Sequence, residues 1–255
     1  MLLKQMKSGK LDVKIFSNRA EMGHRAASDV AGCIRSLLAI KDCIYIVFAA
    51  APSQNEFLDA LVREEGIDWN RIHALHMDEY VNLPPDAPQG FGNFLRKAIF
   101  DKVPFASVDY IGSGPDAQAT CARYEKILRS VQVDIVCLGI GENGHIAFND
   151  PHEADFHDEK LIKMVNLDQT CRMQQVHDGC FARIEDVPKY AVTLTIPAMV
   201  SADFMFCVVP AASKAAAVKA AVTGPVSESC PASILQTHTN AILYADADSA
   251  NGIMK

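Results

Sequence analysis

The sequence contains no run of apolar residues that approaches the roughly 20 needed to cross a bilayer. Its first residues, MLLKQMKSGKLDVK, lack the continuous apolar core of a secretory signal peptide. The eight cysteines form no C-x-x-C pair, and several lie in apolar stretches where cysteine behaves as a small hydrophobic residue. We therefore expect a reduced, cytoplasmic protein that has no membrane partner.

The chain also has no excess of basic over acidic residues. The formal net charge of the 255 residues is −7, so the chain lacks the basic stripe that a nucleic-acid surface needs. A phosphorylated small molecule is still compatible with this charge, because helix ends and a few local cations can hold one phosphate. A small-molecule partner is thus expected, and no nucleic acid. A homo-oligomer stays open, since no stripe in the sequence identifies an interface.

Common catalytic signatures are absent too. The eight histidines occur at neither H-x-x-x-H nor H-E-x-x-H spacing, which argues against a metal site. No G-x-S-x-G element supports a serine hydrolase. GIGENG (139–144) has the spacing of a dinucleotide-binding motif, but the acid expected about 20 residues later is not clearly on a strand. The motif therefore needs another explanation.

Short apolar runs alternate with longer segments of helical periodicity. This pattern indicates an α/β fold, with a mainly parallel, Rossmann-like sheet and helices on both faces. No internal repeat or linker interrupts it, so a single domain over residues 1–255 is predicted. Strands are predicted at 12–18, 43–51, 71–80, 108–113, 133–141, 202–210 and 240–246, and helices at 19–40, 53–64, 92–103, 115–130 and 211–222.

Residues 149–190 have the least regular pattern and are rich in His, Asp and Gln. A long section without a clear pattern inside a compact domain is often functional. We therefore interpret 151–190 as an active-site lid. The alternative is that the section contains helices whose pattern is weak.

Polar segments follow three of the predicted strands: AAAPSQN at 49–55, MDEY at 77–80 and GENGHIAFND at 141–150. Ligands of open α/β sheets bind outside the carboxyl ends of the strands. In a parallel sheet these three segments open onto one crevice. Their convergence predicts a binding site more strongly than any single motif does.

Asp78, Glu79 and His145 are the candidates for proton transfer. Asp78 and Glu79 follow an apolar strand, and one of the two would be a general base at the edge of a pocket. The alternative is a pair of solvated turn carboxylates. Glycines around His145 permit tight turns, and a neighbouring acid such as Asp150 would orient the ring. The alternative is a histidine bonded to the backbone in a turn.

Ser53 and Lys214 suggest an anion site. Ser53 lies where a helix N-cap is expected, and helix N-termini bind phosphate through their free N–H groups. Lys214 lies in the first turn of a predicted helix, where a cation opposes the helix dipole unless an anion is nearby. Simple capping by Ser53 and a solvated lysine are the alternatives.

HMDEYVNLP, LGIGENGHIAFNDP, VPKYAVTLT and SKAAAVKAAV resemble, in the same order and at similar spacing, the glucosamine-6-phosphate deaminase/isomerase family. The resemblance implies conversion of glucosamine 6-phosphate and water to fructose 6-phosphate and ammonia, with no metal or organic cofactor. The alternatives are a 6-phosphogluconolactonase-type hydrolase, whose family shares the fold, and a non-catalytic sugar-phosphate-binding protein. The chain has no basic N-terminal module of the kind that regulators of this fold carry.

The resemblance also implies roles for individual residues. His145 would open the sugar ring, Asp78 would carry the C2 proton to C1, and Asn143 and Asp150 would complete the catalytic set. Lys214 would bind phosphate together with N–H groups near Ser53. The remaining substrate-binding candidates are Gln54, Glu79, Gly141, Ala147 and Arg172.

Several positions depart from the family pattern. The family often has aspartate at the position of Asn143 and glutamate at that of Asp150, and its first phosphate loop is usually rich in Gly and Thr. Neither Arg172 nor Arg183 falls in register with the family's phosphate-binding arginine. The reaction type therefore follows more firmly than the sugar, and a related amino-sugar phosphate or isomerisation without ammonia release stays open.

Overall fold

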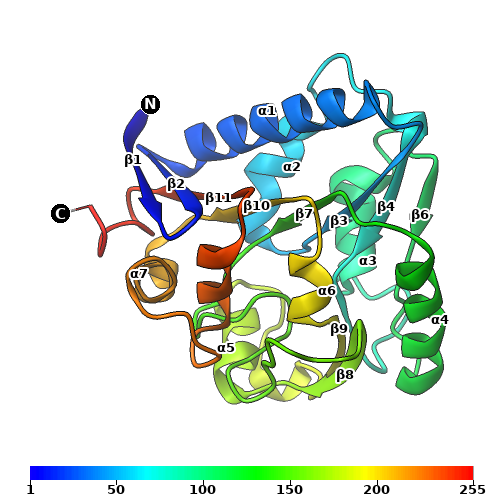
Figure 1. The fold of residues 1–255 in the computed structure, drawn as a ribbon. Helices are drawn as coiled ribbons and strands as arrows, with labels where there is room; N and C mark the ends of the chain where they lie inside the picture. Colours follow the sequence, from blue (N-terminus) through cyan, green and yellow to red (C-terminus); the bar gives the residue numbers. More distant parts are fainter. Residues whose placement is uncertain (255) are drawn as a thin grey trace.

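A twisted sheet of eight strands forms the centre of the molecule (Figure 1). This computed structural model describes residues 1–254, and within them the strand order is β1-β2-β11-β10-β7-β3-β4-β6. β1 is antiparallel to β2, and every other neighbouring pair is parallel, which confirms the predicted sheet. The strands are β1 (Leu2–Ser8), β2 (Leu11–Phe16), β3 (Ile44–Phe48), β4 (Ile72–His76), β6 (Ser107–Asp109), β7 (Ile135–Leu138), β10 (Phe204–Val209) and β11 (Ala241–Asp246).

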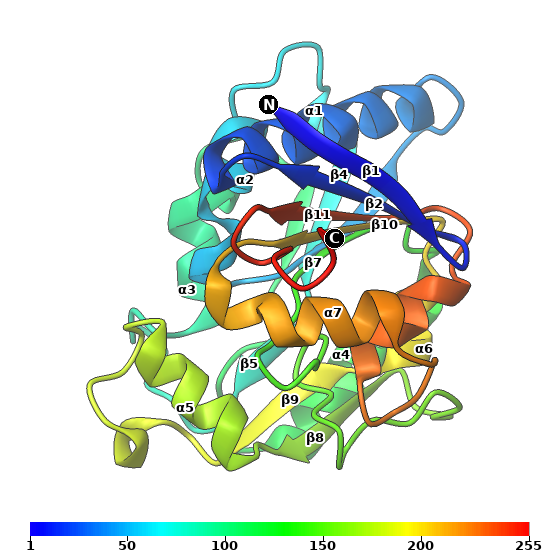
Figure 2. The same ribbon diagram turned by 90° about the vertical axis from the view of Figure 1, so that its left-hand side faces the viewer.

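Helices cover both faces of this sheet, as predicted (Figures 1 and 2). Successive residues of β7 show why its sequence is continuously apolar. Ile135 and Cys137 join one core, whereas Val136 and Leu138 join the other, so both faces of the strand are buried. The first core also contains α1 (Arg19–Leu38), α2 (Asn55–Leu61) and α3 (Phe91–Leu95), and the second contains α4 (Ala117–Ser130), α6 (Ile196–Val200) and α7 (Ala215–Thr223).

The strand predicted at 71–80 is wrong as a single element. β4 ends at His76, and β5 (Asp78–Tyr80) pairs antiparallel with β9 (Tyr190–Leu194). β9 pairs in turn with β8 (Ile162–Asn166), so these strands form a second sheet. Met77, which lies between the two strands, is buried as well, so the apolar run continues from one sheet into the other without a break. Sequence periodicity therefore cannot show the change of sheet.

Residues 151–190 contain more regular structure than the sequence pattern predicts. They include β8, the start of β9 and helix α5 (Gln169–His177). Asp168 caps α5, because its side chain accepts a hydrogen bond from the N–H of Cys171. The alternative of an undetected helix is therefore correct. The function of this section as a lid stays a prediction.

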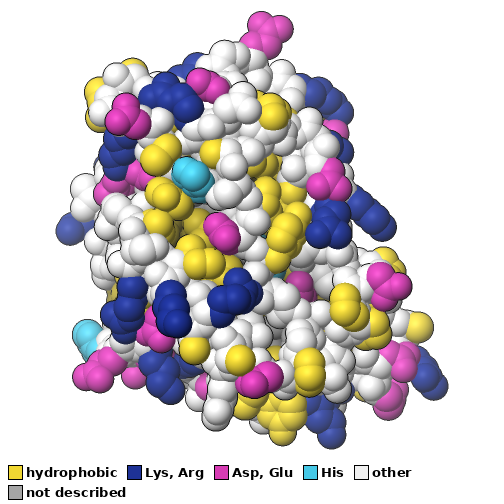
Figure 3. All heavy atoms as spheres, turned by 90° about the vertical axis from the view of Figure 1, so that its right-hand side faces the viewer, with side chains coloured by type: hydrophobic (Ala, Val, Ile, Leu, Met, Phe, Trp, Pro, Cys, Tyr) yellow, Lys and Arg dark blue, Asp and Glu magenta, His cyan; other side chains and the backbone are white. Residues whose placement is uncertain are grey.

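The sequence pattern does not predict β1, because its residues alternate between exposed and half-buried and form no apolar run. It lies at one edge of the sheet, and the short strand β6 lies at the other. The face that carries β6 and α4 exposes hydrophobic side chains in a hollow around a histidine, among side chains of both charges (Figure 3). Among residues 1–254, no helix is both long and apolar enough to span a bilayer.

A buried network holds the chain where β4 ends. The Tyr124 hydroxyl accepts a hydrogen bond from the N–H of His76 (3.1 Å) and donates to its carbonyl (3.0 Å). The His76 ring donates from Nδ1 to the carbonyl of Asp78 (3.0 Å) and accepts at Nε2 from the N–H of Ile111 (2.8 Å). Burial lowers the pKa of this ring to about 4. The ring is therefore neutral at physiological pH, and it fixes the backbone of Asp78.

We expect acid to destabilise the protein through His76. The unfolded histidine has a pKa of about 6.5, so below this value the unfolded chain binds a proton that the folded chain still rejects. The free energy of unfolding therefore falls as the pH drops from about 6.5 towards 4, by roughly 2–3 kcal/mol at pH 4.5. Urea unfolding at pH 7 and pH 4.5 measures this loss.

His76→Asn is the control, because asparagine keeps a donor for the Asp78 carbonyl but does not ionise. The variant should be less stable at pH 7 and should lose correspondingly less stability in acid. An equal acid dependence in both proteins would contradict this explanation.

Candidate functional site

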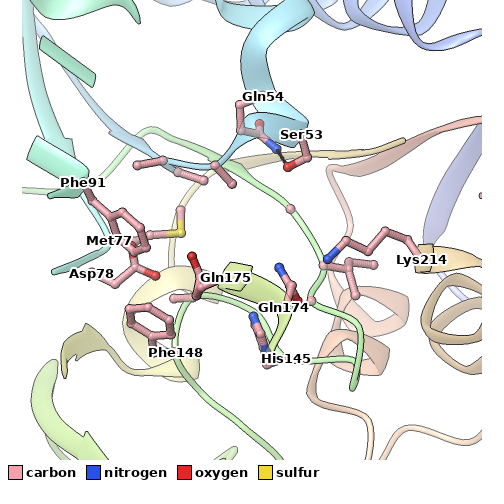
Figure 4. Close-up of a pocket in the computed structure, with 17 residues that line it drawn as sticks. Ser53, Gln54, Met77, Asp78, Phe91, His145, Phe148, Gln174, Gln175 and Lys214 are labelled. Carbon is pink, nitrogen blue, oxygen red and sulfur yellow. Dashed lines mark hydrogen bonds between the residues drawn. The ribbon is translucent and has the colours of Figure 1, made fainter. Parts of the chain in front are cut away.

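Four adjacent parallel strands, β10, β7, β3 and β4, end around one pocket (Figure 4). The segments that follow these strands supply the polar groups predicted from the sequence: Lys214 after β10, His145 after β7, Ser53 after β3 and Asp78 after β4. α5 closes the pocket from outside the sheet. The space left is about 60 Å³.

The loop after β7 depends on a close contact between Gly141 and His145. A methyl group on Gly141 would lie 2.1 to 2.4 Å from three atoms of the His145 ring, so only glycine fits. The N–H of Gly141 also donates to the carbonyl of His145 over 2.9 Å. Ala147 follows with a φ of 48°, in the left-handed region that costs a non-glycine residue energy. The backbone of this loop therefore restricts the His145 ring to one position.

Asn143 and Asp150 lie behind the His145 ring and orient it. Nδ1 of His145 lies 2.7 Å from Oδ1 of Asn143 and 3.0 Å from a carboxylate oxygen of Asp150. Both of these atoms are acceptors, so Nδ1 carries the proton. Nε2 makes no hydrogen bond with residues 1–254, and the ring borders the pocket. The ring is thus set to exchange a proton at Nε2 with a bound molecule.

Asp150 keeps its charge despite its burial. Burial alone would raise the pKa of the Asp150 carboxyl, but hydrogen bonds from His145, Asn143 and the N–H of Asp168 outweigh it and hold the pKa below its usual range. Nδ2 of Asn143 donates to Asp150 over 2.9 Å and to Asp168 over 3.0 Å. The amide therefore bridges the imidazole to two carboxylates.

Potential metal ligands also come together here. The ligand atoms of His145, Asp150 and Cys171 lie within 4.8 Å of one another, as do those of Asp150, His152 and Asp168. In the first group His145 already contacts Asp150, and in the second Asp150 accepts from the N–H of Asp168 over 3.2 Å. Asp150, which both clusters share, is already engaged by these contacts, and we assign no metal to either cluster.

Asp78 borders the pocket on the side opposite Lys214, beside Met77 and Phe91 (Figure 4). The residue is only 6% exposed, and no hydrogen bond or ion pair within residues 1–254 engages its carboxyl group. Burial, and secondarily the charge of Glu79, raises its pKa well above the usual range. A carboxylate in such surroundings is a strong base.

Lys214 borders the other side of the pocket. Its Nζ is buried and makes no hydrogen bond in the described part of the chain. Burial lowers the pKa of this ammonium group, and the negative charges of Asp178 and Glu142 only partly offset that effect. A buried cation without a partner is costly, so this end of the pocket favours an anionic ligand.

Ser53 does not cap a helix as expected. It lies within a short 3-10 turn (Pro52–Gln54) that precedes α2, and Ala51 is at the N-cap. Its hydroxyl accepts a hydrogen bond from Nε2 of Gln54 over 3.1 Å, and the same nitrogen donates to the carbonyl of Val208. Both side chains nevertheless line the pocket near Lys214.

The structure does not place every predicted residue at the pocket. The Glu79 carboxylate accepts hydrogen bonds from the N–H groups of Tyr80, Phe91 and Gly92, so it holds the start of α3 instead. Arg172 donates to the carbonyls of Ile184 and Val187, and the exposed Arg183 pairs with Asp186. Of the predicted residues, Ser53, Gln54, Asp78, Gly141, His145, Ala147 and Lys214 do line the pocket.

Residues missed by the sequence reasoning complete the site. Gln174 accepts a hydrogen bond from the N–H of Glu142 over 2.8 Å and so ties α5 to the loop after β7. Gln175 lines this pocket and also a neighbouring one of about 300 Å³. In the sequence, the feature that could have indicated these two residues is a pair of adjacent glutamines in a segment with a weak helical pattern. Phe91, Gly139 and Ile140 also line the pocket and lie outside the three predicted polar segments, whereas Met77, Phe148 and Ala49 to Ala51 lie within those segments.

Comparison with known proteins places these features in a family. Residues 17–244 match the family model described as glucosamine-6-phosphate isomerases/6-phosphogluconolactonase. Glucosamine-6-phosphate deaminases of Bacillus cytotoxicus and Bacillus cereus are each 38% identical over 192 residues, or 74% of this chain and 71% of theirs. A solved monomeric glucosamine-6-phosphate deaminase superposes with a TM-score of 0.85 and 27% identity, over 97% of this chain and 100% of that one. A 6-phosphogluconolactonase from Thermotoga maritima, at TM-score 0.76 and 20% identity over 92% of this chain and 99% of its own, shares the fold.

Gly141→Ala should displace the His145 ring, because the new methyl group cannot coexist with it. We expect the exchange-protected Nδ1–H proton of His145 to disappear from the NMR spectrum. The melting temperature should also fall by a few degrees, as for a loss of about 1–2 kcal/mol. Gly114→Ala is the matched control, since a methyl group there meets nothing within 4 Å. An unchanged His145 signal in Gly141→Ala would contradict the close contact.

Proposed function

The chain belongs to the glucosamine-6-phosphate isomerase/6-phosphogluconolactonase family, and on this premise we propose that it deaminates glucosamine 6-phosphate. The products are fructose 6-phosphate and ammonia. The observation that carries the proposal is the buried carboxyl group of Asp78, which faces the same pocket as His145 and lies opposite Lys214. The three groups match the three tasks of the reaction.

His145 opens the sugar ring. Its Nδ1 proton is held by Asn143 and Asp150, so Nε2 is the atom that exchanges a proton with the sugar. The neutral Nε2 takes the proton of the C1 hydroxyl and delivers it to the ring oxygen as the bond between C1 and that oxygen breaks, which leaves the open-chain aldehyde. The carboxylate of Asp150, 3.0 Å from Nδ1, keeps the ring in place during this exchange.

Asp78 moves the carbon-bound proton. In the open-chain aldehyde its carboxylate takes the proton from C2, which leaves an enolamine, and returns it to C1. The resulting imine at C2 adds water and expels ammonia, which leaves the ketose phosphate. The hydrophobic neighbours Met77 and Phe91 make the carboxylate a stronger base by excluding water from it.

Lys214 binds the phosphate. Its unpaired ammonium group and the hydroxyl of Ser53 both border the pocket away from Asp78 (Figure 4). When the phosphate of the sugar binds there, C1 and C2 at the other end of the sugar lie towards Asp78. No arginine lines the pocket among the described residues, so Lys214 carries most of the charge recognition.

α5 moves to admit the sugar. The pocket of about 60 Å³ is far below the several hundred Å³ of typical ligand sites. Gln174 and Gln175 occupy the outer side of the pocket. An outward shift of α5 joins the pocket to the space beside Gln175 and makes room for a hexosamine phosphate. This is the lid role proposed for 151–190.

Lactone hydrolysis is the competing activity, because 6-phosphogluconolactonases share the fold. Opening a lactone needs no base to remove a proton from carbon. A buried, strongly basic carboxylate at the position of Asp78 therefore favours the deaminase. A binding protein without turnover would have no use for that carboxylate either.

Asp78→Asn should abolish deamination, by at least about 10³-fold in kcat, because the amide cannot accept the C2 proton. Ammonia and fructose 6-phosphate released from glucosamine 6-phosphate are the quantities to measure. Asp116→Asn, at an exposed helix N-cap, is the matched control and should retain full activity. Substantial ammonia release by Asp78→Asn would exclude the assigned role, and 6-phosphogluconolactone would then be the next substrate to test.

Lys214→Met should weaken phosphate recognition and also stabilise the free protein. Methionine fills similar space without a buried charge, so we expect a gain of about 1 kcal/mol in the free energy of unfolding. Inorganic phosphate should raise the melting temperature of the wild-type protein and not that of the variant. KM for the sugar phosphate should rise roughly 100-fold. An equal thermal shift by phosphate in both proteins would place the anion elsewhere.

A further inference from the structure

Asp168 connects α5 to the residues that orient His145. One oxygen of its carboxylate accepts the N–H of Cys171 at 2.6 Å and so caps α5. The other oxygen accepts Nδ2 of Asn143 at 3.0 Å. Its backbone N–H donates to Asp150 at 3.2 Å. The residue therefore contacts both groups that touch Nδ1 of His145, although it touches neither the ring nor the pocket.

Asn143 makes this connection necessary. An amide, unlike a carboxylate, presents an acceptor on one side and a donor on the other. Its oxygen must face His145, where it meets both Nδ1 and the backbone N–H (3.1 Å). Its two N–H groups must then find acceptors, and Asp150 and Asp168 supply one each. The hydrogen-bonding capacity of the amide is thereby filled.

We propose that Asp168 is a positioning residue for His145, which through the Asn143 amide holds the ring in its Nδ1–H tautomer and contributes negative charge behind it. The proposal rests on the deaminase function only for its kinetic effects. In a chain with aspartate at 143, the charge would contact the ring directly. Here the charge lies one residue further away, at the start of α5.

The pair of residues 143 and 168 allows a test by exchange. Asp168→Asn leaves one acceptor where two are needed, so either the helix cap or the Asn143 contact is lost. Asn143→Asp places three carboxylates together, at 143, 150 and 168. In the double variant that combines both substitutions, the new amide oxygen at 168 caps α5 and its nitrogen donates to the new carboxylate at 143. The hydrogen bond between the two positions is then restored with its direction reversed.

We expect Asp168→Asn to lower kcat roughly tenfold, with KM within about twofold of the wild-type value. The ¹⁵N shifts of the neutral His145 ring should show a growing share of the Nε2–H tautomer. The double variant should recover kcat to within about threefold of the wild type and regain the Nδ1–H tautomer, which is the signature of direct coupling. Asp116→Asn, which changes the cap of α4 alone, should leave both readouts unchanged.

Two results would overturn the proposal. One is an Asp168→Asn variant that matches Asp116→Asn in kcat and tautomer, because asparagine is as good an N-cap as aspartate. The other is a double variant whose kcat and share of the Nδ1–H tautomer are no higher than those of the more impaired single variant. The tautomer is measured without substrate, so it tests Asp168 even if the wild-type protein releases no ammonia. That outcome would remove the proposed function alone.

Discussion

His145 donates its Nδ1 proton to Asn143 over 2.7 Å, and the rest of the site is arranged around this hydrogen bond. Gly141 is required because the ring lies against its Cα. Asp150 retains its charge although it is buried, because the ring and the amide both contact it. With Nδ1 engaged in this way, Nε2 is left without a hydrogen bond among residues 1–254, and the ring borders the pocket. In the proposed mechanism, the orientation of one amide therefore decides which ring nitrogen exchanges a proton with the sugar.

Two ionisable groups, one on each side of the pocket, are buried at a cost in free energy. Asp78 and Lys214 are both buried, and neither side chain makes a hydrogen bond or an ion pair with the described residues. Burial favours the neutral form of each group, so it raises the pKa of Asp78 and lowers the pKa of Lys214. In the proposed function, a phosphorylated amino sugar supplies an anion to Lys214 and an acidic C–H group to Asp78. On that proposal, the free energy cost of burying these two groups is relieved when the substrate binds.

α5 links recognition to catalysis in the proposed mechanism. Its first turn begins at Asp168, behind His145, and its last turn carries Gln174 and Gln175 at the pocket. A movement of this helix that admits the sugar also changes the contacts of Asn143 and Asp150. In the proposed mechanism, one short helix therefore couples opening of the site to alignment of the histidine.

The alternation of strands and helices follows from the sequence alone, because buried parallel strands are continuous apolar runs and amphipathic helices keep a regular period. The sequence also predicts that Asp78, His145 and Lys214 lie at one edge, since parallel strands end on the same side of the sheet. Tertiary structure alone decided that β5 leaves the main sheet after Met77, because both sheets bury the same apolar pattern. It likewise decided that Glu79 holds α3 and that Asp168 reaches Asn143. Such contacts join residues far apart in the chain, and neither periodicity nor local spacing carries information about them.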